Sequence, residues 1–150
     1  MKILSTLFLS VLLLCAAPSQ AADDWNGLHA WVGRYPSEHV AGPLPLLAQP
    51  ALKAALGKLL PKAERQTLAR LDVETPVRQS GDTLIIHLCR PRNCPTDLAM
   101  IVVLPSQKKV WAGFFTREAG RISTRWYGNQ DDYMSLPEEL RKEFATRHGN

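Results

Sequence analysis

Two cysteines separated by four residues, Cys89 and Cys94, most strongly constrain how this chain can fold. They enclose the sequence Arg-Pro-Arg-Asn and lie between two apolar runs, residues 83–89 and 98–104. The first run is rich in β-branched residues and the second is continuously apolar, as expected for neighbouring β-strands. A disulfide between the cysteines would close the mouth of a hairpin, and it would constrain the unfolded chain by about 2 kcal/mol.

The first 21 residues have the features of an export signal. Export determines whether the cysteines can form a disulfide. Lys2 gives a positive start, an apolar run extends to Cys15, and Ser19-Gln20-Ala21 offers a cleavage site. We expect residues 1–21 to be removed and residues 22–150 to form a single domain in the oxidising compartment to which it is exported. Removal takes away Cys15, and the two remaining cysteines can form one intramolecular disulfide in that oxidising compartment.

Charge and hydropathy argue against two classes of partner. The chain has 18 basic and 14 acidic residues, a net charge of +4, and loss of Lys2 leaves 4 − 1 = +3. The basic residues are scattered and the aromatic residues form no stacking platform, so no nucleic-acid partner is predicted. After the signal, no stretch approaches about 18 consecutive apolar residues, and we expect no membrane insertion of the mature chain.

Apolar spacing predicts helices in the first half of the mature chain and at its end. A short helical turn is expected at residues 25–32, followed by an irregular segment rich in Gly and Pro. Apolar residues then recur at intervals of three and four, which predicts helices at residues 50–60 and 61–71. Near the end, Ser135 precedes Pro137 and two acidic residues, a pattern typical of a helix start.

Between these helices the apolar period changes to two, which predicts β-strands. The expected strands are residues 73–79, 83–89, 98–104, 110–116 and 121–127. Because consecutive strands are joined by short turns, they should form an antiparallel meander. The sequence therefore predicts an α+β fold in which helices cover one side of an antiparallel sheet of about five strands.

The segment between the cysteines is predicted to be a rigid, basic loop. Pro91 fixes one φ angle and the disulfide fixes both ends, so Arg90, Arg92 and Asn93 should be held in one arrangement before a partner arrives. Spacing alone leaves two interpretations open: a stabilised surface hairpin with solvated arginines, or a loop that binds an acidic partner. A redox role is less favoured, because four intervening residues do not reproduce the Cys-x-x-Cys spacing.

The loop and the strands after it resemble the Ivy family, which are periplasmic inhibitors of vertebrate-type (c-type) lysozyme. The similarity is clearest over residues 88–127, including the strand at 98–103, the Trp-Ala-Gly-Phe-Phe-Thr sequence at 111–116 and the strand leading to Trp126. The resemblance implies a homodimeric α+β protein whose loop enters the lysozyme cleft and forms hydrogen bonds with the two catalytic carboxylates.

Members of that family typically carry Cys-Lys-Pro-His-Asp-Cys in the loop, and this chain departs from it. The positions that match outright are Cys89, Pro91 and Cys94. Arg90 replaces a lysine of the same sign, Arg92 stands at the histidine position, and Asn93 stands at the aspartate position. Arg92 brings a permanent charge and a planar fork that suits a bidentate carboxylate contact, on a longer side chain than histidine.

Two functional hypotheses follow. The first is an inhibitor of a peptidoglycan-cleaving glycosidase, either a c-type lysozyme or a lytic transglycosylase, with Arg92 as the main probe of the acidic cleft. The second is a periplasmic binding module for an anionic cell-envelope ligand, in which the changes at Arg92 and Asn93 have removed lysozyme inhibition. Neither hypothesis requires a cofactor or a metal.

An enzyme is not predicted. The histidines are far apart in sequence and lack the pairing expected of metal ligands or catalytic groups; they are His29, His39, His87 and His148. Asp131 and Asp132 lie in a polar turn and should be solvated. Four aromatic residues could line a sugar groove, but their alternation places most of them in the core or under helices. They are Trp111, Phe114, Phe115 and Trp126.

Overall fold

The computed structural model describes residues 23–94, 96–128 and 137–148, without the side chains of residues 145, 147 and 148. The predicted export signal, the Asp131-Asp132 pair and the helix cap at Ser135 lie outside these residues. Among the described residues, no helix combines the length and the apolar character needed to cross a bilayer.

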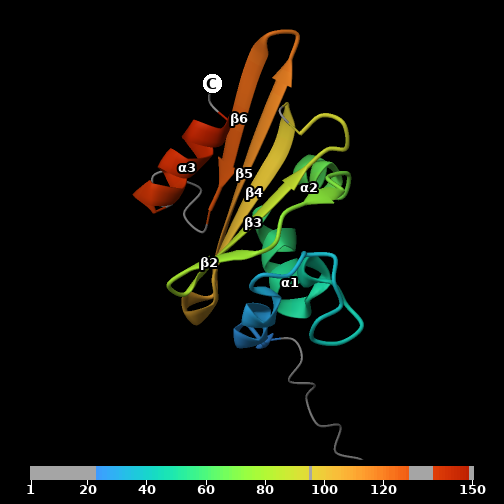
Figure 1. Ribbon diagram of the computed structural model, residues 1–150, viewed down its shortest axis with the longest axis vertical. Helices are drawn as coiled ribbons and strands as arrows, with labels where there is room; N and C mark the ends of the chain where they lie inside the picture. Colours follow the sequence, from blue (N-terminus) through green and yellow to red (C-terminus); the bar gives the residue numbers. More distant parts are fainter. Residues whose placement is uncertain (1–22, 95, 129–136, 149–150) are drawn as a thin grey trace, which may run out of the picture.

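The centre of the molecule is one antiparallel sheet of six strands in the order β1-β3-β4-β5-β6, with β2 also paired to β3 (Figure 1). The strands are β1 (Val73–Glu74), β2 (Arg78–Ser80), β3 (Thr83–Cys89), β4 (Asp97–Leu104), β5 (Lys109–Glu118) and β6 (Arg121–Tyr127). From β3 onward, each strand pairs with the next along the chain, which confirms the predicted meander.

The first predicted strand, residues 73–79, is divided into β1 and β2 around Pro76. Proline has no backbone N–H to donate to a ladder, and it interrupts pairing with β3. The neighbouring Val77 pairs with the N-terminal segment instead: its N–H donates to the Arg34 carbonyl at 2.8 Å, and its carbonyl accepts from Gly33 N at 2.9 Å. The N-terminal segment is thereby attached to this edge of the sheet.

Helices form at each of the predicted places, with somewhat shorter bounds. They are α1 (Pro50–Leu59), α2 (Lys62–Leu68), α3 (Glu138–His148) and the short 3-10 helices η2 (Asn26–Trp31), η3 (Leu46–Ala48) and η4 (Pro105–Gln107). Pro50 occupies the first turn of α1, where its missing N–H costs no helical hydrogen bond.

The α+β class and the antiparallel sheet are confirmed, but the helices lie on both faces of the sheet and not on one. Helices α1 and α2 cover one face, and α3 covers the other (Figure 1). The second core joins Met100, Val102 and Phe115 of the sheet to Leu140 and Phe144 of α3. Strands β3 to β5 are buried and apolar on both faces, so each face requires a cover.

A glycine in β5 allows α3 to dock. The ring of Trp126 lies over Gly113, where a Cβ atom would come within 2.6 Å of the Trp126 ring. On its other side, Trp126 packs edge-to-face against Phe144, with ring centroids 4.3 Å apart. The absence of a side chain at Gly113 therefore leaves room for the indole of Trp126, which in turn packs against α3.

Candidate functional site

The hexapeptide loop, residues 89–94, projects from the end of the β3–β4 hairpin. The disulfide predicted between Cys89 and Cys94 is present, with Cα atoms 4.8 Å apart. Beyond the strands, Arg90 N donates to the carbonyl of Asp97 at 2.9 Å, which extends the ladder by one contact. The base of the loop is thus closed by a disulfide and held by a backbone hydrogen bond.

The loop reverses direction in a tight turn at Pro91 and Arg92. Asn93 N donates to the Arg90 carbonyl at 2.9 Å and closes this turn. Arg92 has a φ of 66°, in the left-handed region. Proline at the second position and a positive φ at the third are the features of a type II turn, where glycine is the usual third residue. An arginine here adopts a backbone conformation that costs roughly 1–2 kcal/mol.

The return segment of the loop is fixed by the carbonyl of Asn93. This oxygen accepts hydrogen bonds from Thr96 N and Asp97 N, both at 2.8 Å, and from Thr96 Oγ1 at 3.2 Å. The Asn93 carbonyl thus joins the tip of the loop to the residues at the start of β4.

The four predicted partner-binding residues are all exposed: Arg90, Pro91, Arg92 and Asn93. The two arginines differ in their surroundings. Arg90 is half-exposed (50%) and its Nη1 lies 3.4 Å from Asp97 Oδ2. Arg92 forms no hydrogen bond or ion pair with any residue that the structure describes. Arg92 is thus the cation at the tip, whereas Arg90 belongs partly to the base.

A buried polar cluster near the loop was missed by the sequence analysis. Glu64 of α2 is 6% exposed and accepts hydrogen bonds from Arg125 Nε and Nη2 of β6 and, at 3.2 Å, from Tyr127 Oη. Arg125 Nη1 also donates to Thr116 Oγ1 at 3.4 Å and to Ser123 Oγ at 3.1 Å. The cluster ties α2 to the outer strand of the sheet.

The same contacts alter the ionisation of this cluster. The hydrogen bond with Glu64 raises the pKa of Arg125 above its ordinary value. Burial, together with the nearby charge of Glu64, raises the pKa of Tyr127. One sequence signal could have revealed the cluster: Glu64 lies four residues after Leu60 and four before Leu68, on the apolar stripe of the helical segment.

The three histidines whose side chains the structure describes are not brought together, and the side chain of His148 lies outside the described part. His29 Nε2 contacts Asp82 Oδ1 at 3.1 Å near the sheet end that carries η4, and His39 is exposed on the N-terminal segment. His87 is buried under α3, with Nε2 3.8 Å from Glu143 Oε1. Among the described residues, no group of three or more His, Cys, Asp or Glu side chains could hold a metal ion.

The aromatic residues lie mainly in the core, as predicted. Trp111, Phe114 and Phe115 are buried, and Trp126 packs under α3. They form no exposed sugar groove in the described part of the chain.

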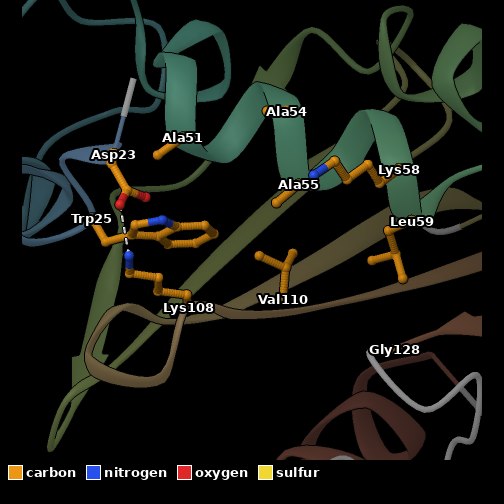
Figure 2. Close-up of a pocket in the computed structure, with 10 residues that line it drawn as sticks. All are labelled: Asp23, Trp25, Ala51, Ala54, Ala55, Lys58, Leu59, Lys108, Val110 and Gly128. Atoms are coloured by element: carbon orange, nitrogen blue, oxygen red, sulfur yellow. Dashed lines mark hydrogen bonds and ion pairs between the residues drawn. The ribbon is translucent and has the colours of Figure 1, made fainter. Parts of the chain in front are cut away.

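A separate pocket of about 660 Å³ lies between α1 and β5 (Figure 2). Aliphatic side chains of α1 and β5 and three charged side chains line it, with Trp25 at one end and Lys58 at the other. Lys108 Nζ is 2.7 Å from Asp23 Oδ2, and this hydrogen-bonded ion pair holds the pKa of Asp23 below its ordinary value. The pocket is near the start of β5, whereas the hexapeptide loop is near the end of that strand. It is therefore a feature apart from the loop.

Fold and site together define a small α+β protein that presents a disulfide-closed basic loop. A family model described as "Inhibitor of vertebrate lysozyme (Ivy)" matches residues 51–150, two thirds of the chain. The chain belongs to the Ivy family, a family of lysozyme inhibitors and not of enzymes. No curated protein and no solved structure matches the chain.

Proposed function

We propose that this protein inhibits a peptidoglycan-cleaving glycosidase in the periplasm by inserting the hexapeptide loop into the acidic catalytic cleft. The observation that carries the proposal is the position of Arg92: it is exposed at the tip of a closed loop and has no partner among the described residues. A cation held in this way is available to an external carboxylate.

The chemistry of the target cleft suits a guanidinium. Retaining glycosidases hold two carboxyl groups about 5 Å apart, and one of them is ionised in the resting enzyme. The planar fork of Arg92 can donate two parallel hydrogen bonds to a carboxylate. Occupation of these carboxyl groups by Arg92 would block both proton transfer and substrate entry.

Preorganisation of the loop supports tight binding. The disulfide, the turn at Pro91 and the hydrogen bonds to the Asn93 carbonyl fix the backbone before contact. Each rotamer-rich side chain that is ordered on binding costs about 0.5–1.5 kcal/mol. In this loop the remaining cost falls mainly on Arg92, because Arg90 is already held by Asp97.

The family description favours a c-type lysozyme as the target. Arg92 replaces the shorter histidine typical of the family, which requires a deeper cleft or a shallower approach of the loop. A lytic transglycosylase is therefore a second candidate target.

A side-by-side titration tests the proposal. The purified protein is added to a c-type lysozyme and to a lytic transglycosylase at two salt concentrations, and turnover is measured. We expect inhibition that saturates at one loop per active site, and we expect Arg92→Glu to weaken it at least about 30-fold, as for loss of a desolvated charge contact. The control is Lys53→Glu, an equal charge reversal at an exposed site on α1. Equal inhibition by both variants would exclude the mechanism.

Two further outcomes separate the alternatives. Retention on purified cell wall without inhibition of either enzyme would support the binding module for an anionic envelope ligand. Periplasmic export and homodimer formation stay predictions, which cell fractionation and sedimentation analysis can test.

A further inference from the structure

The β5–β6 hairpin extends beyond the first residue of β4, on the side of the sheet end from which the hexapeptide loop emerges. Asp97, the first residue of β4, pairs with Thr116, and β5 runs on for two residues to Glu118. At about 3.4 Å per residue, this extension projects roughly 7 Å. Figure 1 shows its turn, in orange, at the top of the molecule, beyond the yellow β3–β4 connection. We name residues 117–122 the distal arm.

The distal arm is attached to the base of the loop. Arg117 N donates to the Thr96 carbonyl at 2.7 Å, and Thr96 in turn holds the carbonyl of Asn93. Two basic projections therefore emerge side by side from one end of the sheet, with a fixed spacing between them.

The turn of the arm is a regular two-residue hairpin. Ala119 and Gly120 both have positive φ, at 48° and 79°, between the paired residues Glu118 and Arg121. Positive φ at both central positions is the signature of a type I′ turn, whose twist matches that of the strands. The guanidinium of Arg117 lies over the Phe115 ring, 5.8 Å from its centroid. The arm is therefore ordered in the free protein.

The two projections are unevenly charged. The loop and the arm together carry four arginines and one carboxylate, and Arg90 pairs with Asp97 at the start of β4. The other charged residues are Arg92 at the tip of the loop and Arg117, Glu118 and Arg121 on the arm. Ile122, which is 51% exposed, faces the same side of the arm as Arg117. Glu118 and Arg121 lie on the opposite face of the arm. With two arginines and one glutamate, the arm has a net charge of 2 − 1 = +1 and suits an acidic partner with some apolar contact.

A polar notch of about 210 Å³ separates the two projections. The loop contributes Arg90, the start of β4 contributes Asp97, β5 contributes Thr116 and Glu118, and the segment after α2 contributes Arg70. If the loop enters a cleft, the notch and the adjoining arm would face the wall of that cleft on this side.

We infer that the distal arm is a second binding element, which contacts an acidic lip of the same glycosidase while the hexapeptide loop occupies the cleft. This inference rests on the proposed function. The arm also limits how deeply the loop enters and selects clefts whose lip fits the notch. Arg121, at the exposed start of β6, is the residue whose charge should contribute most to encounter with that lip.

Charge reversal at Arg121 tests the inference. Binding of Arg121→Glu, Arg92→Glu and Lys53→Glu to a c-type lysozyme and to a lytic transglycosylase is compared with wild type at two salt concentrations. For the enzyme that the wild type inhibits, we expect Arg121→Glu to bind about 5- to 20-fold more weakly, mainly through slower association, with a smaller salt dependence. Lys53→Glu should change affinity less than about 2-fold, because it lies on α1 away from the arm.

Each outcome has a distinct meaning. If Arg92→Glu weakens binding but Arg121→Glu behaves like Lys53→Glu, the distal arm is not a binding element and the proposed function stands. If the wild type binds neither enzyme, the proposed function fails and the arm with it. The milder variant Arg121→Gln, which keeps a polar residue beside the turn, should bind with intermediate affinity, and melting temperatures of all variants check that each is folded.

Discussion

Arg90 and Asp97 contact each other twice across the base of the hexapeptide loop. Arg90 N donates to the Asp97 carbonyl at 2.9 Å, and the two side chains approach to 3.4 Å. This relationship makes Arg90 a support for the loop more than a probe of the partner. The Asp97 carboxylate, which lies beyond the second cysteine, thereby has a role in positioning Arg90.

The first prediction concerns Asp97→Asn, which removes the charge and keeps the backbone contacts. The side-chain pair is solvent-accessible, so the free energy of unfolding should fall by less than about 1 kcal/mol. Inhibition should weaken about 3- to 10-fold, because Arg90 must then be ordered on binding. Glu138→Gln, which breaks the exposed pair with Lys142 on α3, is the matched control. An inhibition constant equal to that of the control would show that the Asp97 carboxylate does not position the loop.

The second prediction separates stability from function at Arg92. Glycine adopts a φ of 66° without the steric cost that arginine has there, so Arg92→Gly should raise the free energy of unfolding by up to about 1 kcal/mol. Inhibition should nevertheless be lost, since the guanidinium is absent. Arg92→Ala should lose inhibition without gaining stability. Denaturant unfolding of the three proteins provides the comparison, and a glycine variant less stable than the alanine variant would contradict the assigned turn.

The third prediction concerns the buried Glu64. Glu64→Gln leaves Arg125 without its anionic partner, and we expect a loss of about 1–3 kcal/mol, below the usual range for buried pairs because Arg125 is one-third exposed. The double variant Glu64→Leu/Arg125→Met removes both charges and should recover part of this loss. Urea unfolding measures all three proteins. A double variant less stable than Glu64→Gln would show that the pair itself is a net stabilising contact.

The fourth prediction concerns high pH. The pKa of Tyr127 is raised from its ordinary value of 10.0, by burial and then by Glu64, so the unfolded chain releases this proton first as the pH rises. The contribution of Tyr127 to stability is therefore complete below about pH 10 and decreases as the pH rises through the folded-state pKa. Tyr127→Phe should lack this part of the decrease. Unfolding free energies between about pH 9 and 11 measure it, with Tyr35→Phe at an exposed site as control. Parallel profiles for wild type and Tyr127→Phe would count against the assignment.

Local patterns in the sequence were sufficient for most of the sheet. Strands β3 and β6 have the predicted bounds, because alternation of apolar residues and flanking turns are local signals. The division of the first strand at Pro76 was also visible in principle, since proline cannot continue a ladder. The face covered by α3 was not predictable. Leu140 and Phe144 define an apolar stripe, but nothing in the stripe specifies which side of the sheet it meets.

The candidate site was predictable only in part. Closure by Cys89 and Cys94 and exposure of the residues between them followed from the sequence pattern. The supports at Thr96 and Asp97 lie beyond the second cysteine, and their hydrogen bonds appear only once the loop is folded. The distal arm was likewise hidden, because its place beside the loop depends on the strand register at Thr116.

The hydrogen bonds that shape the hexapeptide loop involve the main chain of Asn93 and leave its side chain, like that of Arg92, without a bond among the described residues. These are the two positions at which the chain differs in chemical character from the loop typical of its family. A scaffold built in this way allows the tip to change identity with little loss of stability. Substitution of these two residues should therefore change the chemistry of the tip and leave the hydrogen bonds of the loop in place.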